Sequence, residues 1–311
     1  MVFRSVVSVL VRFVVRTFST NSRPALRAAG RPHVHTASPP WWHHREQDLN
    51  SALPVRRLVT VPGRCTGWFH GMSAVKNGLA ATMSRERRLE RVRNVRRRLT
   101  HDGPPWTREH ANDFNVVTVP DRDCDILRDL LIAEGVETIV EVGLAYGRSA
   151  LAIGEALVSV DATRPLHVVI DPMQATAWSN VGWEMLRGAG LDTTTRLILQ
   201  PSSIALPQLI SEGCVADAAF VDGSHRFHEV FIDLYFLRKI VRPGRIIVMD
   251  DQLWPSVRTA AHYFELNMGW RAVPGAFDAG TVDHDTGRAL LRAFRLPDPP
   301  FEPSFEDFQP F

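Results

Sequence analysis

One stretch decides the fold of this chain: Thr138-Ile-Val-Glu-Val-Gly-Leu-Ala-Tyr-Gly-Arg-Ser-Ala-Leu151. It opens as a short apolar run, passes through Gly143 and Gly147, and continues as a helical pattern to about Val160. A buried strand that leads through a glycine turn into a helix is how an open α/β sheet builds a nucleotide pocket. The glycines let a ligand approach the backbone, and the first N–H groups of the helix stay free to bind it.

The chain on both sides of this stretch alternates between short apolar runs and helical patterns. The other apolar runs predict strands at 167–170, 196–199, 218–221 and 246–249, and the helical patterns fall at 121–134, 178–187, 202–209, 227–241 and 255–268. Two late segments, 270–273 and 289–294, can pair as an antiparallel hairpin. This order predicts a Rossmann-like α/β fold with a doubly wound, seven-stranded, mostly parallel sheet and a C-terminal antiparallel hairpin.

The composition is that of a globular protein, but the charge is unevenly distributed. Of the 311 residues, 45% are hydrophobic and 23% charged. Residues 1–82 hold 11 basic and 2 acidic side chains, which leaves 25 basic and 32 acidic ones and a net charge of −7 for the rest. That balance argues against a nucleic-acid partner for the sheet domain. The three cysteines are far apart in sequence, which favours a reducing compartment such as the cytoplasm.

The N-terminal 82 residues lack a sustained helical or strand period, so we expect a poorly structured extension. Their first 22 residues contain no apolar run long enough to span a membrane. One interpretation is an Arg- and Ser-rich transit peptide, which would place the protein in mitochondria. The other, which we favour, is a start assigned too early, because Met83 opens a coherent element.

A basic amphipathic helix is predicted for residues 83–100, where eight arginines surround a narrow stripe of apolar residues. We interpret it as a solvated helix that docks by that stripe; an RNA-associated or membrane-surface role is the alternative. Gly103-Pro-Pro105 ends it. The expected organisation is an extension (1–82), this helix with a linker (83–120), the sheet domain (121–296) and a Pro-rich tail (297–311).

Acidic residues stand where the predicted strands end. Asp171 follows the second strand, Asp222 the fourth, and Asp250 with Asp251 the fifth. Ligands of open α/β sheets lie beyond the carboxyl ends of the strands, so these acids should converge on the pocket. Asp171 comes 24 residues after Gly147, where a carboxylate can accept the hydroxyl protons of a ribose, and this predicts an adenosine-type ligand. The structural alternative for each acid is a helix cap or a turn former.

The three later acids suggest a cation site. Asp222, Asp250 and Asp251 offer hard oxygen donors that could share a Mg²⁺ ion, which keeps several waters and binds substrate oxygens. The alternative is that they bond only nearby loop N–H groups. His225 lies three residues after Asp222 and is a candidate general base, since imidazole exchanges protons near neutral pH. A loop histidine that only bonds the backbone is the interpretation we favour.

These residues resemble a known family. Glu141-Val-Gly-Leu-Ala-Tyr-Gly147 resembles motif I of the class I S-adenosyl-L-methionine-dependent methyltransferases, and Asp171 resembles the acid that ends their second strand. The small-molecule O-methyltransferase branch, often called methyltransferase family 24, is similar in two further runs: Phe220-Val-Asp-Gly-Ser-His-Arg-Phe-His-Glu-Val230 and Val241-Arg-Pro-Gly-Arg-Ile-Ile-Val-Met-Asp-Asp251. The similarity covers roughly residues 121–296.

The resemblance implies a cofactor site for S-adenosyl-L-methionine. It implies that the turn holds the methionine part of the cofactor and that residues after it contact the carboxylate, ribose and adenine. The positions concerned are Glu141, Gly143, Ala145 and Gly147 for the methionine part, Ser149 for its carboxylate, Asp171 for the ribose, Ser202 or Ser203 for the adenine, and Asp222 beside the cofactor.

The resemblance also implies methyl transfer to an oxygen of a small molecule. In catechol-type relatives, carboxylates that match Asp222, Asp250 and Asp251 ligate Mg²⁺ and orient a substrate hydroxyl. Asp251 stands where those relatives often have Asn, and no matching lysine base follows Asp222. Enzymes that methylate base nitrogens usually carry an Asp/Asn-Pro-Pro-aromatic turn after strand four, and this chain has Asp222-Gly-Ser-His225 there.

Two other functions share part of this pattern. An NAD(P)-dependent oxidoreductase would also have a glycine turn and a ribose acid, but its turn needs Gly-x-Gly-x-x-Gly and this chain has Gly-x-x-x-Gly. A non-catalytic adenosyl- or RNA-binding module would use the Arg-rich helix, with strongly salt-dependent binding. The sequence names neither the methyl acceptor nor the oligomeric state, and a homo-oligomer is one of the options.

Overall fold

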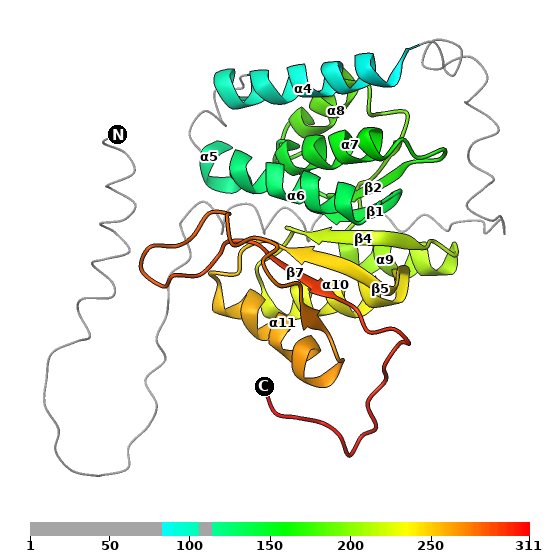
Figure 1. The fold of residues 1–311 in the computed structure, drawn as a ribbon, viewed down its shortest axis with the longest axis vertical. Helices are drawn as coiled ribbons and strands as arrows, with labels where there is room; N and C mark the ends of the chain where they lie inside the picture. Colours follow the sequence, from blue (N-terminus) through cyan, green and yellow to red (C-terminus); the bar gives the residue numbers. More distant parts are fainter. Residues whose placement is uncertain (1–82, 106–113) are drawn as a thin grey trace, which may run out of the picture. The chain divides into compact units, whose positions relative to one another are not determined.

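A computed structural model describes residues 83–105 and 114–311 (Figure 1); the expected extension 1–82 lies outside them. Two helices, α4 (Arg85–Asp102) and α5 (Phe114–Val117), precede the alternating part of the chain. The elements that follow are α6 (Asp121–Ala133), β1 (Thr138–Val142), α7 (Arg148–Val160), β2 (Leu166–Ile170), α8 (Val181–Ala189), β3 (Thr195–Ile198), α9 (Ser202–Ser211), β4 (Ala216–Val221), α10 (Phe227–Ile240), β5 (Val241–Met249), α11 (Pro255–Asn267), β6 (Arg271–Ala272) and β7 (Arg292–Arg295).

The sheet has the order β3-β2-β1-β4-β5-β7-β6. The first five strands run parallel, and β7 pairs antiparallel with both β5 and β6. This confirms the expected Rossmann-like seven-stranded sheet with its C-terminal antiparallel pair. The order reverses between β1 and β4, and the edge above that point is where ligands of such sheets bind.

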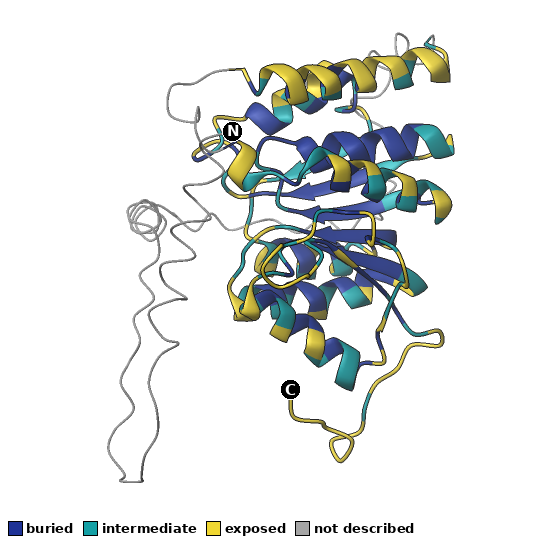
Figure 2. Cartoon of the chain, turned by 60° about the vertical axis from the view of Figure 1, so that its left-hand side comes forward, coloured by how far each residue is buried: buried dark blue, intermediate teal, exposed yellow. Residues whose placement is uncertain are grey.

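Helices cover both faces of the sheet, and each face has its own apolar core. Val140 of β1 packs in a cluster with residues of α9, α10 and α11, whereas the neighbouring Ile139 packs in a cluster with residues of α6 and α7. Figure 2 shows the central strands buried throughout. Strands that are buried on both faces are expected to be continuous apolar runs, and for this reason the parallel strands could be predicted from the sequence.

The Arg-rich helix docks on the sheet domain through its apolar stripe. Val92, Val95 and Leu99 are buried in a cluster with residues of α7 and α8. This confirms the predicted amphipathic helix and its predicted apolar stripe. Arg93 and Arg96 also reach the carboxylate of Glu155 on α7, which is only 1% exposed, so part of the arginine charge is neutralised inside the molecule. Within the described residues, no helix combines the length and apolarity that a membrane span requires.

We expect Glu155→Gln to lower the free energy of unfolding by roughly 2–3 kcal/mol, because Arg96, whose side chain is 14% exposed, then keeps only Asp125 as an acidic partner among the described residues. Glu184→Gln on α8 is the matched control, since its ion pair with Arg187 is half exposed on both sides and should contribute less than about 0.5 kcal/mol. Urea unfolding of both variants measures the difference. Equal losses would contradict a stabilising role for the buried pair.

The Pro-rich tail has no helix or strand but is bonded along its length to α10 and α11. Arg238 of α10 pairs with Glu302, and Asn267 of α11 exchanges two hydrogen bonds with the backbone of Gln309. The ring of Phe311 then lies against Phe227 at the start of α10. The tail therefore covers part of the helical layer on that side of the sheet.

Asp233 is a buried acid of α10 whose protonation should set the pH dependence of stability. Burial raises the pKa of its carboxyl to about 7, against a smaller lowering by Ser202, and its Oδ1 has no hydrogen-bond partner within the described residues. A folded-state pKa above the unfolded value means stability that is present below about pH 4 and lost as pH rises to about 7. The stability of Asp233→Asn relative to the wild type should therefore rise by roughly 2–4 kcal/mol between pH 5 and pH 8, measured as thermal unfolding at both pH values. A constant difference between the two proteins would contradict this.

Candidate functional site

The glycine turn after β1 is shaped by residues with positive φ. Gly143 has φ +98° and Gly147 has φ +81°, and Ala145 between them has φ +42°. A Cβ added to Gly143 would lie 2.0 Å from the carbonyl oxygen of Asp222, so only glycine fits there. Gly147 caps α7 without a side-chain hydrogen bond, which leaves the N–H groups of the first helical turn available to a ligand.

Asp171 lies directly beneath this turn and is 4% exposed. Its Oδ2 accepts hydrogen bonds from the backbone N–H groups of Leu144 (3.1 Å) and Ala145 (3.0 Å), and its Oδ1 accepts one from Met173. Gln174, which the sequence did not single out, donates to both Asp171 and the Ala145 carbonyl. Asp171 therefore holds the turn in place, as the structural alternative anticipated, and its contact with a ribose stays a prediction.

Glu141 lies in β1 with none of its surface exposed, and its carboxylate contacts two other side chains. Ser149 of α7 donates a 2.6 Å hydrogen bond to Oε1, and Nε2 of His167 on β2 lies 2.8 Å from Oε2. The structure thus brings Glu141 and Ser149 together, as predicted for residues of one site. His167 was missed, and its only signal was a polar residue in the otherwise apolar run 166–170.

The two serines predicted near an adenine begin helix α9. Ser202 is half-buried and Ser203 is exposed. A hydrogen bond ties Ser202 to the carboxyl of Asp233, where it opposes the rise in that group's pKa. Ser203 is the more solvent-exposed of the two serines. Their contact with the adenine stays a prediction.

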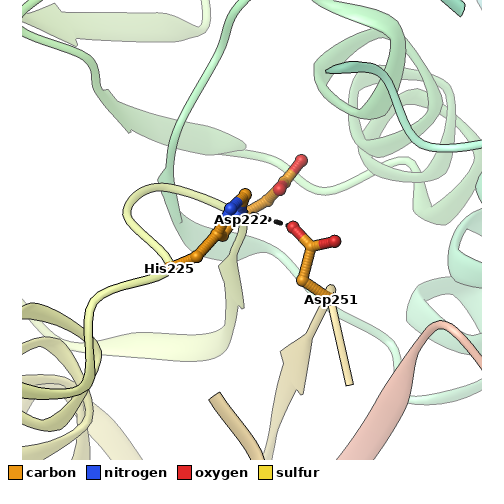
Figure 3. Close-up of side chains that lie close together, drawn as sticks. All are labelled: Asp222, His225 and Asp251. Atoms are coloured by element: carbon orange, nitrogen blue, oxygen red, sulfur yellow. Dashed lines mark ion pairs between the residues drawn. The ribbon is translucent and has the colours of Figure 1, made fainter. Parts of the chain in front are cut away.

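Asp222, His225 and Asp251 lie close together at the carboxyl ends of β4 and β5 (Figure 3). One donor atom from each side chain falls within 4.8 Å of the other two, and Nε2 of His225 forms an ion pair with Oδ2 of Asp251. Asp250 is not in this group: it is 7% exposed, and its carboxylate accepts a 2.7 Å hydrogen bond from the N–H of Asp251. The structure therefore places Asp222 and Asp251, two of the three acids predicted to bind a metal, next to His225, the predicted general base.

Burial and mutual repulsion make the carboxyl groups of Asp222 and Asp250 hard to ionise. Burial raises the pKa of Asp222 well above its usual range, and the charges of Asp250 and Asp251 raise it further. Burial likewise raises the pKa of Asp250, with Asp251 as the next cause. A bound cation would reverse both effects. The two carboxylates of the group are hard oxygen donors that fit a divalent ion, so the predicted Mg²⁺ is chemically compatible with them.

Trp254 is a second residue of the site that the sequence did not single out. Its ring is nearly parallel to that of His225, at 12°, with the centroids 6.3 Å apart. The side chain is 53% exposed although it is large and apolar. An exposed indole beside a polar cluster offers a flat apolar surface to a ligand.

The fold and the site together define a class of protein: a doubly wound α/β domain with a glycine turn and acidic strand ends at its switch point. Residues 140–252 match the model of a family described as a methyltransferase domain. This match confirms the resemblance seen in the sequence and gives no support to the oxidoreductase alternative.

Known proteins similar to this chain carry related names. A protein of Arabidopsis thaliana, named provisionally as a caffeoyl-CoA O-methyltransferase, is 26% identical over 152 residues, which are 48% of this chain and 60% of the relative. A Bacillus cereus O-methyltransferase solved in complex with S-adenosylhomocysteine (SAH) is similar in structure, with 16% identity, a TM-score of 0.48, and coverage of 72% of this chain and 97% of that one. The O-methyltransferase TomG of Streptomyces achromogenes, solved with S-adenosyl-L-methionine, gives 16% identity, a TM-score of 0.49, and coverage of 72% and 96%.

Proposed function

We propose that this chain is an S-adenosyl-L-methionine-dependent methyltransferase that methylates an oxygen atom of a small molecule. The observation that carries the proposal is the contact between two parts of the family-matched segment. The glycine turn after β1 lies against the backbone of Asp222, so a cofactor on that turn would border the group of Asp222, His225 and Asp251. The O-methyltransferase name of the Arabidopsis relative supports an oxygen acceptor.

The residues around the turn fit this cofactor. Gly143 lets the turn pack closely against the backbone of Asp222, and the α7 N–H groups suit the carboxylate of the methionine part. Glu141 is a buried acid in the strand that leads into the turn, and an acid there suits a positively charged ligand. When bound, S-adenosyl-L-methionine supplies a methyl group on a sulfonium centre. The chain's part is to bind and orient that group and to keep water away from it.

The acceptor would lie on the other side, beside Asp222, Asp251 and Trp254. We assign the two carboxylates to a divalent ion such as Mg²⁺, which would orient the acceptor hydroxyl and ease its ionisation. His225 would then take the hydroxyl proton, a role that suits imidazole near neutral pH. The exposed face of Trp254 favours a flat or aromatic acceptor.

Calorimetric titration of S-adenosyl-L-methionine and SAH into the full chain, with and without Mg²⁺, tests the proposal. We expect micromolar binding that Asp171→Ala removes, because the substitution deletes the acceptor of two N–H groups of the turn. Glu306→Ala, an exposed acid of the tail, is the control and should bind as the wild type does. A folded wild type that binds neither compound would refute the proposal. Preferential binding of NADH would instead support the NAD(P)-dependent oxidoreductase alternative.

A SAH analogue without one ribose hydroxyl separates the two roles of Asp171. If its carboxylate contacts the ribose, the analogue should bind about tenfold more weakly than SAH to the wild type. Equal binding of both would leave Asp171 as a residue that only holds the turn.

A further inference from the structure

His167 is a buried histidine of β2 that lies next to Glu141, an acid of the proposed cofactor site. In the pairing of β1 with β2, His167 is opposite Ile139 and Glu141 is opposite Val169. These four residues share one face of the sheet, so His167 and Glu141 are diagonal neighbours on the side covered by α7. His167 is 1% exposed and Glu141 is fully buried.

The two residues form a chain of contacts with Ser149. The hydroxyl of Ser149 donates to Oε1 of Glu141 at 2.6 Å, and Nε2 of His167 lies 2.8 Å from Oε2. The His167 contact does not have hydrogen-bond geometry, and Nδ1 of the ring has no hydrogen-bond partner within the described residues. An ionised carboxylate is costly to bury unless a partner compensates it, and no arginine or lysine of the described residues pairs with Glu141.

His167 could be only a packed core residue, but its placement indicates more. Ser149 is the second residue of α7, whose first turn carries the free N–H groups. A change in the orientation of the Glu141 carboxylate would therefore move the Ser149 hydroxyl in the first turn of α7. A purely apolar side chain at 167 would fill the same space and leave the acid without its neighbour.

We infer that His167 is a positioning residue for cofactor binding. Its imidazole is the nitrogen partner of the buried Glu141 carboxylate and restricts the orientations open to it, and Glu141 in turn fixes the Ser149 hydroxyl at the start of α7. His167 acts through Glu141 and does not itself touch the ligand. The inference rests on the proposed function, because the ligand concerned is S-adenosyl-L-methionine.

Calorimetric titration of S-adenosyl-L-methionine into the full chain tests it. We expect His167→Leu to weaken binding about tenfold and His167→Gln, whose amide offers Glu141 another nitrogen partner, to stay within about threefold of the wild type. Val169→Ala is the matched control: it lies on the same strand and face, and it should lower the melting temperature while leaving the affinity within about twofold.

A double-mutant cycle with Glu141→Gln separates positioning from packing. If His167 acts through Glu141, His167→Leu should cause less than about a twofold further loss in the Glu141→Gln background. Full additivity, or a folded His167→Leu variant with wild-type affinity, would overturn the inference. If His167→Leu does not fold, the cycle is run with His167→Met, which likewise cannot donate to Glu141, and the same additivity would overturn it. A wild type that fails to bind would instead refute the proposed function.

Discussion

Gly143→Ala should abolish S-adenosyl-L-methionine binding and lower the free energy of unfolding by roughly 2–5 kcal/mol. The new methyl group would lie 2.0 Å from the carbonyl oxygen and 2.6 Å from the carbonyl carbon of Asp222, and neither backbone atom can move aside cheaply. The residue also has φ +98°, a conformation that strains any side chain. Calorimetric titration and urea unfolding measure the two losses.

Gly188→Ala provides the control. Nothing lies within 4 Å of a Cβ at Gly188, which sits inside helix α8, so the substitution should stabilise the helix by roughly 0.5–1 kcal/mol and leave binding unchanged. Wild-type affinity in a folded Gly143→Ala variant would show that the turn does not bind the cofactor.

Asp222→Asn should weaken Mg²⁺ binding roughly 100-fold or more and, in the absence of the ion, stabilise the protein. The folded-state pKa of Asp222 is raised, so its contribution to stability is present at low pH and lost as pH rises through that pKa. At pH values above the unfolded-state pKa the raised folded-state pKa therefore opposes folding, and a neutral amide removes that cost. Melting temperatures at pH 7, with and without Mg²⁺, test both expectations.

Asp233→Asn is the control for this change, because it also neutralises a buried carboxyl but lies on α10 outside the group. It should be stabilised at pH 7 yet keep the Mg²⁺-induced rise in melting temperature. A Mg²⁺ response that survives in Asp222→Asn would contradict the assigned ion site.

The fold could be predicted from the sequence because the parallel strands are apolar on both faces. β1 and β2 were predicted to within one residue for this reason. β5 was predicted from Ile246, whereas the structure begins it at Val241. The Pro243-Gly244 pair is typical of a turn, and the pairing of β5 with β4 does shift register around it. A local pattern cannot show that the strand continues across such an irregularity.

The site was less predictable because the direction of a side chain depends on the backbone after the strand ends. Asp250 and Asp251 are indistinguishable in sequence, but Asp251 adopts φ +57° and faces His225, while Asp250 turns inward. Likewise, the place of Asp171 at the strand end was correct, yet its bonds to the turn depend on how the loop folds over it. The position of His167 became informative only once the register of β1 and β2 placed it beside Glu141.

The strand ladders extend into the loops that carry the site. The N–H of Gly143 bonds the carbonyl of Ile170, that of Asp222 bonds Val142, and that of Asp250 bonds Val221. Each loop is thus fixed to its neighbour by the residue that follows the strand. The conformational entropy of these residues is lost when the chain folds and not when a ligand arrives. A ligand of this edge would meet a preorganised surface, so its affinity would be little reduced by ordering costs, and its association should be limited mainly by diffusion and orientation.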